Sequence, residues 1–388
     1  MSVTANQRRL LLELLADLRP HWHRDRNLPA RLQSWLAARR AGSRDRRLYR
    51  ELTYTALRIL PWIESASEDE AVGLIAAEAA DTPATRDFRA AYAQPDLVAT
   101  ADRAALLPVW LAAEAPALLA DSAHGDTLRS RAPLWIRQQT GAPDRFLAEC
   151  TARGWSARRA EVLRTAWQLP ADAPVTDTAA YRAGDIEVQD LGSQLILAAT
   201  APDAGGQWFD ACAGAGGKTL QLAQLLGPGG HVTAHDIRAD ALKELRIRAD
   251  RAGLRNVTVT RSAPASGGFD GVLVDAPCSG SGTWRRAPHL KWTTTPGDLA
   301  RAAAIQGELL NRFAGLVRAG GRLVYATCSI CRTENQAVVE TFLREHPEFA
   351  EVAPAAAFGL TPGSPGTAIL PATHDTDGFY FATLRRAG

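Results

Sequence analysis

From Gln207 onward, short apolar runs alternate with amphipathic stretches of helical period, and this alternation constrains the fold more than any other feature. Such an order of segments predicts a parallel, doubly wound α/β sheet, in which ligands bind beyond the carboxyl ends of the strands. The expected strands are QWFDA, HVTAHD, NVTVTR, DGVLVD and RLVYATC, and the expected helices are residues 218–226, 240–252 and 298–317. In the last helix Ile305, Leu309, Phe313 and Leu316 line one face.

The region before this alternation has a different pattern. Between residues 8 and about 120 leucines recur at helical spacing, for example Leu11, Leu14, Leu15 and Leu18, which predicts an all-α helical bundle. APLWIRQQT reads as a strand, and residues 142–185 mix short helices and strands. We therefore predict three domains: a helical domain at 1–125, a small α+β segment at 126–185 and the doubly wound domain at 186–388.

Composition limits the cellular setting. With 46% hydrophobic and 22% charged residues and no apolar run near twenty residues, the chain is expected to be globular, with no membrane partner. The N-terminal apolar patch is interrupted by acids and Arg19, so we interpret it as an amphipathic helix rather than a signal peptide. Five cysteines without an export signal favour the cytoplasm.

Charge is unevenly distributed along the chain. Residues 1–60 contain thirteen arginines against five acids, although the net charge of the whole chain is only +2. A basic face of this kind binds phosphates, but it is also typical of an ordinary solvated helical surface. Charge alone leaves both interpretations open.

The segment DACAGAGGKT, residues 210–219, predicts a ligand loop. Its glycines Gly214, Gly216 and Gly217 let backbone approach a ligand at the N-terminus of the next helix. A P-loop would need glycine at Cys212, and the G-x-G-x-x-G dinucleotide pattern is absent. The alternative is a tight strand-to-helix turn with no ligand.

Asp236 ends the second expected strand, nineteen residues after Gly217. A carboxylate there is placed to accept hydrogen bonds from ribose hydroxyls. A glycine loop and an acid without a phosphate cradle fit an adenosine ligand that lacks a pyrophosphate, such as S-adenosylmethionine.

Two segments place cysteines at expected strand ends. In DAPCSGSGTWRRAPHLKW, Cys278 follows Asp275, and it is either a small buried hydrophobe or a thiolate favoured by nearby cations. Those cations, Arg285, Arg286 and Lys291, are also candidates for phosphate contacts. In YATCSICRTEN, Cys328 and Cys331 form a C-x-x-C pair, but neither the context of a redox motif nor a second ligand pair for zinc accompanies it. We therefore predict no metal site.

These segments, together with AHD and KW, resemble the motifs of the Nol/Nop/Sun family of RNA cytosine-5 methyltransferases. QDLGSQLI and DGFYFATL are similar to the family motif ahead of the first strand and to its closing strand. GSRDRRLYRELTY is similar to the NusB-like extension of bacterial members that act on small-subunit ribosomal RNA. The resemblance covers nearly the whole chain and implies a Rossmann-like methyltransferase domain that uses S-adenosylmethionine.

The resemblance also implies roles for individual residues. Carbon 5 of cytosine is a poor nucleophile until a thiolate adds to carbon 6. Cys328 is then the nucleophile, Cys278 assists release, Asp275 contacts the base near N3 or its amino group, and Lys218 lies within reach of cofactor or active site. The cofactor would be lined by Cys212, Ala213, Gly214, Ala215, Gly216, Gly217, Lys218, Asp236 and Asp275.

The chain departs from the family pattern at two places. Ala215 replaces the proline of the family's C-A-A-P-G-G-K, and TRSAPASGG offers only Ser262 where the family often has an acid after the third strand. We expect a monomer that methylates carbon 5 of a cytosine in ribosomal RNA, with the N-terminal domain, Arg285, Arg286 and Lys291 contacting the RNA. The alternatives are an RNA-binding or ribosome-assembly factor with weak or no activity and, less supported, an NTP-driven RNA enzyme.

Overall fold

The computed structural model describes residues 2–139 and 143–388, and the chain forms two compact units. The first unit is Met1–Arg131 with Thr283–Pro296, and the second is Ala132–Gly282 with Gly297–Gly388. These units divide the chain at other residues than the three predicted domains, because the small sheet packs within the second unit and residues 283–296 pack within the first. The three-domain division remains a prediction.

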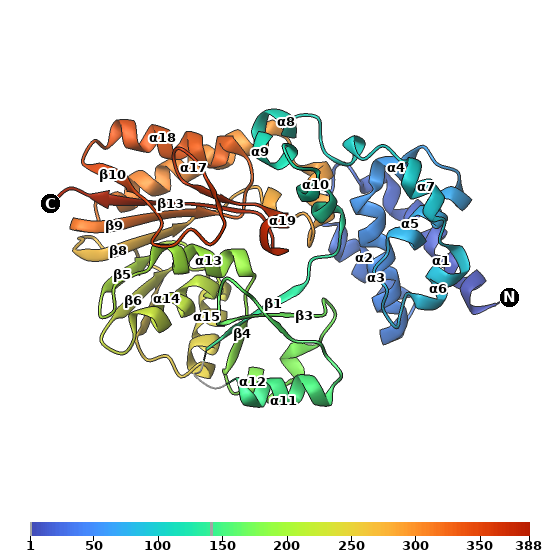
Figure 1. Ribbon diagram of the computed structural model, residues 1–388, viewed down its shortest axis with the longest axis horizontal. Helices are drawn as coiled ribbons and strands as arrows, with labels where there is room; N and C mark the ends of the chain where they lie inside the picture. Colours follow the sequence, from blue (N-terminus) through green and yellow to red (C-terminus); the bar gives the residue numbers. More distant parts are fainter. Residues whose placement is uncertain (1, 140–142) are drawn as a thin grey trace. The chain divides into compact units, whose positions relative to one another are not determined.

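In its described part the first unit is built from helices (Figure 1). The N-terminus of the α5 helix is fixed by a capping box that Ser67 and Glu70 form. The helices are α1 (Val3–Leu18), α2 (Leu28–Ala38), α3 (Ser43–Arg58), α4 (Leu60–Glu64), α5 (Glu68–Glu78), α6 (Arg86–Tyr92), α7 (Pro95–Thr100), α8 (Leu111–Glu114), α9 (Pro116–Leu119), α10 (Ser122–Arg129) and α16 (Pro288–Thr293), with short 3-10 turns at Arg19–His21 and Ala104–Leu106.

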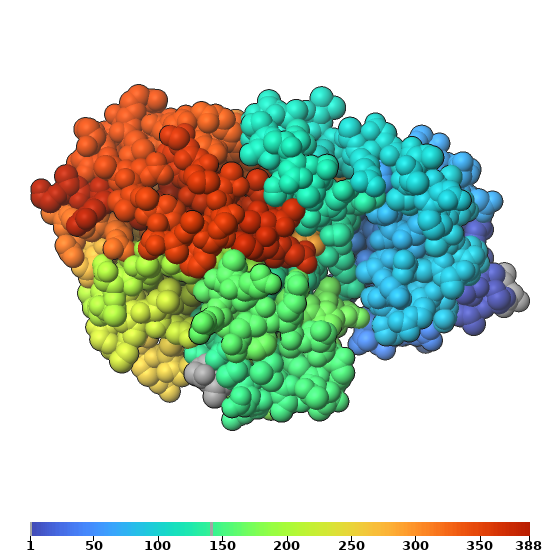
Figure 2. Space-filling model, viewed as in Figure 1, coloured from blue at the N-terminus to red at the C-terminus, as the bar shows by residue number. Residues whose placement is uncertain are grey.

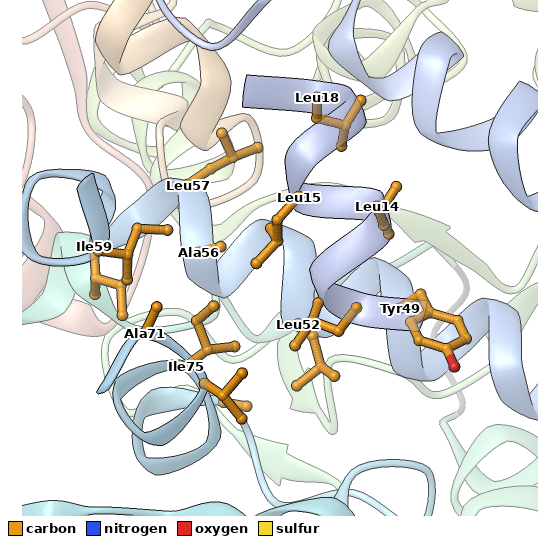
Figure 3. Close-up of a cluster of buried hydrophobic side chains, with 14 of the residues drawn as sticks. Leu14, Leu15, Leu18, Tyr49, Leu52, Ala56, Leu57, Ile59, Ala71 and Ile75 are labelled. Atoms are coloured by element: carbon orange, nitrogen blue, oxygen red, sulfur yellow. The ribbon is translucent and has the colours of Figure 1, made fainter. Parts of the chain in front are cut away.

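The core of the first unit is a cluster of leucines and other apolar side chains (Figure 3). Leu11 and Leu14 of α1 and Leu52 of α3 are fully buried, and the close-up shows α1, α3 and α5 directing such side chains toward one another. The helical spacing of the N-terminal leucines thus predicted the buried face correctly.

The second unit contains a nine-stranded sheet in the order β11-β12-β13-β9-β8-β5-β6-β7, with β10 paired to β13. Strands β5 to β9 run parallel, and β10 to β13 join them by antiparallel pairing. The bounds are β5 (Gln207–Asp210), β6 (His231–His235), β7 (Val257–Thr260), β8 (Phe269–Asp275), β9 (Val317–Thr327), β10 (Phe349–Val352), β11 (Thr361–Pro362), β12 (Thr367–Ile369) and β13 (Phe379–Arg386).

Helices cover both faces of this sheet (Figure 1). The helices α13 (Leu191–Thr200), α14 (Gly217–Leu226) and α15 (Ala239–Arg251) lie on one face, and α17 (Pro296–Ala314) and α18 (Gln336–Glu345) lie on the other. The short helix α19 (Pro371–His374) precedes β13. This doubly wound, Rossmann-like arrangement confirms the predicted fold class.

A small antiparallel sheet with strand order β2-β3-β1-β4 belongs to the same unit. Trp135 of this sheet packs into the core of the large sheet and donates from Nε1 to the carbonyl of Asp375 at 2.9 Å. In Figure 2 the green atoms of this segment lie directly against the yellow-green atoms of the large-sheet segment. Its elements are β1 (Leu134–Gln138), α11 (Asp144–Ala152), β2 (Arg158–Arg159), β3 (Ala166–Leu169), α12 (Ala179–Arg182) and β4 (Ile186–Val188).

Candidate active site

The carboxyl ends of four neighbouring strands meet at one edge of the large sheet. β5 ends at Asp210, β6 at His235, β8 at Asp275 and β9 at Thr327. These strands are adjacent and parallel, so the loops that follow them converge. The motifs at residues 210–219 and 325–335 and the first part of the third motif, residues 275–282, therefore lie together.

The glycine loop after β5 depends on left-handed backbone. Gly214 has a φ of 54° and Gly216 a φ of 92°, a region that residues with a Cβ disfavour. A Cβ at Gly216 would also lie 2.8 Å from Cγ of Leu245. The loop is fastened to the next strand, because the amide of Gly214 donates to Oδ2 of Asp236 at 2.8 Å.

The glycine loop lines a cavity of about 580 Å³, which we call the loop pocket. Eight of the nine residues predicted to hold the cofactor line it, and the ninth, Gly216, does not. The eight are Cys212, Ala213, Gly214, Ala215, Gly217, Lys218, Asp236 and Asp275.

An apolar side of the loop pocket escaped the sequence interpretation. Ile237 and Ile305 line it, and they are 75% and 48% exposed, unlike ordinary core isoleucines. Ile305, Leu309 and Phe313 lie on the predicted apolar face of α17, and of these only Phe313 is buried. Leu316 is also buried, but it lies beyond the helix, which ends at Ala314 rather than at the predicted residue 317. The remaining apolar side chains are thus available to a ligand in the pocket.

Asp236 is fixed as an ionised acceptor. Arg238 donates from Nε to Oδ1 and from Nη2 to Oδ2, each at 2.9 Å. Burial alone would raise the pKa of Asp236, but the hydrogen bonds from Arg238 and Gly214 lower it to about 2. The sequence interpretation selected Asp236 but not Arg238.

The segment after β7 contributes no acid to the loop pocket. Ser262 is exposed and is absent from the residues that line the pocket in the described chain. Arg238 and Arg312 line it instead, and the guanidinium carbon of Arg312 lies 5.1 Å from the ring centroid of Phe313. The acids of the pocket lining are therefore Asp236 and Asp275, and neither comes from the segment after β7.

Lys218 and Asp275 form an ion pair within the loop pocket. The Nζ of Lys218 donates to Oδ2 of Asp275 at 2.8 Å, and the two side chains are 9% and 32% exposed. Beneath them lies Asp210, whose Oδ2 accepts a hydrogen bond from Oγ1 of Thr219 at 2.7 Å. Burial raises the pKa of Asp210 to about 7.

The two cysteines of the motifs face each other. Sγ of Cys278 lies 3.3 Å from Sγ of Cys328, because Cys278 follows β8 and Cys328 follows the adjacent strand β9. The hydrogen bond with Cys328, and burial after it, raise the pKa of the Cys278 thiol well above its ordinary value. At this distance one of the two thiols donates a hydrogen bond to the sulfur of the other.

The remaining cysteines play other parts. None of the five cysteines, all of which lie in the described residues, forms a disulfide, and Cys331 is fully buried with its Sγ 3.4 Å from Oγ of Ser281. Burial, followed by the charges of Asp210 and Asp275, raises the pKa of Cys212 to about 12. Cys212 therefore enters the loop pocket as a neutral thiol.

Two of the three predicted RNA contacts are corrected by burial. Arg285 and Lys291 are each only 2% exposed, because Arg285 donates to Oγ of Ser130 at 2.9 Å and Lys291 donates to the carbonyl of Arg58 at 2.8 Å. Burial also lowers the pKa of Lys291 to about 7. These side chains hold the first unit together, and of the three cations only Arg286 lies at the surface.

Over residues 2–139 and 143–388, no group of three or more His, Cys, Asp or Glu side chains is placed to hold a metal ion. Nor does that part of the chain contain a helix with the length and apolar character needed to cross a membrane.

Known proteins resemble this chain in sequence and fold. Residues 197–385 match the family described as "16S rRNA methyltransferase RsmB/F". Ribosomal RNA small subunit methyltransferase B of Vibrio cholerae is 35% identical over 271 residues, which are 66% of this chain and 59% of that protein. The chain thus spans about 60% of the length of the curated relatives it matches.

Two solved structures share the fold. The crystal structure of PH0851 has a TM-score of 0.72 at 24% identity and covers 91% of this chain and 93% of its own. A methyltransferase homologue from Pyrococcus horikoshii has a TM-score of 0.59 at 24% identity, with 68% of this chain and 90% of its own covered.

Proposed function

Because residues 197–385 belong to the RsmB/F family of 16S rRNA methyltransferases, we propose that this protein methylates carbon 5 of a cytosine in small-subunit ribosomal RNA. One observation carries the cytosine-5 chemistry: the thiols of Cys278 and Cys328 lie 3.3 Å apart. They stand beside Pro277 and Asp275, which line the loop pocket. Two adjacent thiols suit a reaction that both makes and breaks a bond between enzyme and base.

S-adenosylmethionine is the methyl donor, and the residues of the loop pocket fit it. The Asp236 carboxylate would accept hydrogen bonds from the ribose hydroxyls, and Ile237, Ile305 and Leu309 would offer apolar surface to the adenine. Arg238 donates hydrogen bonds to both carboxylate oxygens of Asp236. Because the Arg238 side chain is 67% exposed, it can turn into solvent and leave these oxygens to the ribose. When bound, the cofactor supplies a methyl group carried on a sulfonium sulfur.

Cys328 begins the reaction on the base. Its thiol proton passes to solvent, a bond forms between Sγ and carbon 6, and the π electrons of the carbon 5–carbon 6 bond shift so that carbon 5 becomes nucleophilic. Asp275 contacts the ring near N3 or the amino group, and Lys218 holds that carboxylate at 2.8 Å. This ion pair balances charge that develops on the ring.

Release needs the second thiol. After methylation the proton on carbon 5 leaves to solvent, its electron pair restores the double bond to carbon 6, and the Sγ–carbon 6 bond breaks. The Cys278 thiol keeps its proton because its pKa is raised by the hydrogen bond with Cys328 and by burial. It therefore donates a hydrogen bond to the departing Cys328 thiolate.

The target nucleotide reaches Cys328 by leaving its stack. The arginine-rich residues 1–60 of the helical unit hold the surrounding RNA through phosphates, and the protein acts as a monomer in the cytoplasm. The RNA contact rests on the thirteen arginines in this segment.

Cysteine variants test the reaction. Cys328→Ala should abolish methylation and covalent capture of RNA, whereas Cys278→Ala should accumulate a protein–RNA adduct on denaturing gels. Cys150→Ala, in the small-sheet core, is the matched control and should behave as the native protein. Normal product release by Cys278→Ala would contradict the assigned roles, and bisulfite sequencing of ribosomal RNA identifies the nucleotide.

A second candidate is an RNA-binding or ribosome-assembly factor with weak or no activity. The observation in its favour is the loop pocket without an acid after β7 and with Asp236 held by Arg238. Calorimetry separates the two candidates: heat of binding with S-adenosylmethionine supports the methyltransferase, and its absence at millimolar ligand supports the assembly factor.

A further inference from the structure

One buried carboxylate beside the cysteine pair has no part in the chemistry proposed above. Glu334 lies in the short 3-10 turn Arg332–Glu334, between Cys328 and α18, and is 0% exposed. Burial of an ionised group is costly unless hydrogen bonds replace its water. The hydrogen-bond donors around the Glu334 carboxylate therefore indicate its structural role.

Glu334 binds both cysteine loops through the residue that follows each cysteine. Its Oε1 accepts from the amide of Ser279 at 2.7 Å, and its Oε2 accepts from Oγ of Ser279 at 2.5 Å and from Oγ of Ser329 at 2.6 Å. Ser279 is adjacent to Cys278, and Ser329 is adjacent to Cys328. A single carboxylate thus joins the two backbones that carry the thiols.

A third element reinforces this connection. Nε2 of Gln306, on α17, donates to Oε1 of Glu334 at 3.2 Å and to the carbonyl of Pro277 at 3.0 Å. Gln306 is itself fully buried and accepts from the hydroxyl of Tyr325 at 3.0 Å. Since Pro277 precedes Cys278, the Cys278 loop is held on both sides of its thiol.

Hydrogen bonds to a charged acceptor are among the strong ones in proteins, and each is directional. Four such donors around one carboxylate leave the two loops little freedom to separate. The sulfurs of Cys278 and Cys328 lie 3.3 Å apart as a result. The hydrogen bond between the two thiols depends on this distance.

We propose that Glu334 is a positioning residue that fixes the separation of the Cys278 and Cys328 thiols by holding Ser279 and Ser329 together. The inference deepens the proposed methyltransferase function and rests on it for its catalytic meaning. The separation itself is a property of the protein alone, so it can be measured without RNA or cofactor.

Crosslinking of the two thiols measures the separation directly. Diamide, a diazene oxidant, takes two electrons and two protons from the thiols, becomes a hydrazine and leaves a disulfide. In Glu334→Leu, which keeps volume but removes all acceptors, the rate of Cys278–Cys328 crosslinking should fall roughly tenfold or more. Glu334→Gln keeps one acceptor oxygen, so its crosslinking rate should lie between the rate of Glu334→Leu and that of the native protein.

The matched control is Glu340→Leu, six residues further along, because Glu340 pairs only with the exposed Arg332 in the described structure. It should crosslink at the native rate. Alkylation of the buried Cys150 and Cys331 reports general loosening, and in Glu334→Gln it should stay slow. If Glu334→Leu does not fold, Ser329→Ala replaces it and should also slow crosslinking.

Two results would overturn the inference: a native crosslinking rate in the Glu334 variants, or a loss of rate matched by faster alkylation of Cys150 and Cys331. Its catalytic consequence is tested in the Cys278→Ala background, where Glu334→Gln should slow accumulation of the RNA adduct. Slow crosslinking with no adduct in the Cys278→Ala parent would refute the proposed function and leave the positioning role intact.

Discussion

The ammonium of Lys218 lies 2.8 Å from Oδ2 of Asp275, which joins the first turn of α14 to the last residue of β8. Because both side chains line the loop pocket, the pair links the glycine loop to the loop of Cys278. The ion pair is therefore placed to respond to both the cofactor and the base.

Replacement of Lys218 tests this link. Lys218→Met leaves the partly buried carboxylate of Asp275 without its cation, so methylation should fall by roughly tenfold to a hundredfold. Lys243→Met, on the exposed side of α15, is the matched control and should keep native activity. Initial rates with ribosomal RNA provide the measurement, and equal rates in the two variants would contradict a role for the pair.

Asp210 predicts a pH dependence of stability. Burial raises its pKa from near 3.8 to about 7, so between these values the folded state holds a proton that the unfolded state has lost. The stability contributed by this group is complete below the lower value and is lost as pH rises through the higher one. From about pH 5 to about pH 8 native stability should fall relative to Asp210→Asn by ~2 kcal/mol.

Urea unfolding of both proteins at the two pH values measures this difference. Asp203→Asn, whose native side chain is 87% exposed, is the control and should show no comparable change. A constant difference between native protein and Asp210→Asn across the range would show that Asp210 does not titrate there.

Two glycines give opposite predictions for the same substitution. A Cβ at Gly282 would lie 2.0 Å from the carbonyl oxygen of Gly378, whereas a Cβ at Gly307 meets no atom within 4 Å. Gly282→Ala should lower the free energy of unfolding by about 3 kcal/mol. Gly307→Ala, within α17, should raise it by about 0.5–1 kcal/mol. Thermal melts compare the two, and similar shifts in both would be inconsistent with the packing at Gly282.

Neighbouring arginines separate structural from RNA-contacting roles. Arg285→Ala removes buried hydrogen bonds to Ser130 and Arg131, so it should destabilise the protein by about 2 kcal/mol. Arg286→Ala, at the surface, should lower stability less than Arg285→Ala and should reduce the slope of log affinity against log salt by about 0.9 if Arg286 contacts one phosphate. Filter binding at several salt concentrations tests this, and an unchanged slope removes Arg286 from the interface.

Periodicity predicted the framework of the fold because each element is amphipathic or buried in its own right. The strands at Gln207, His231 and Val257 and the helices α14 and α15 lie within a few residues of their expected positions. The short strands β11 and β12 were not anticipated, because segments of two and three residues carry too little pattern.

The position of a site residue could be predicted where a local motif determines the backbone. It could not be predicted where contacts with distant residues determine whether the side chain is exposed. The glycine loop and Asp236 follow from local sequence, whereas the burial of Arg285 and Lys291 depends on Ser130 and Arg58, which lie far away in the chain. The sequence gives no signal for the role proposed for Glu334 in YATCSICRTEN. That role rests on the hydrogen bonds that its carboxylate accepts from Ser279 and Ser329 in the folded protein.

The division of the chain between its two compact units has an evolutionary consequence. Residues 283–296 leave the large sheet after Gly282, pack in the helical unit and then return to α17, and Trp284 within them is only 1% exposed. Deletion of the first 131 residues would remove the packing partners of residues 283–296 and expose Trp284 and Trp292. A lineage that discarded or exchanged the helical unit would also have to change fourteen residues that lie within the sequence of the second unit.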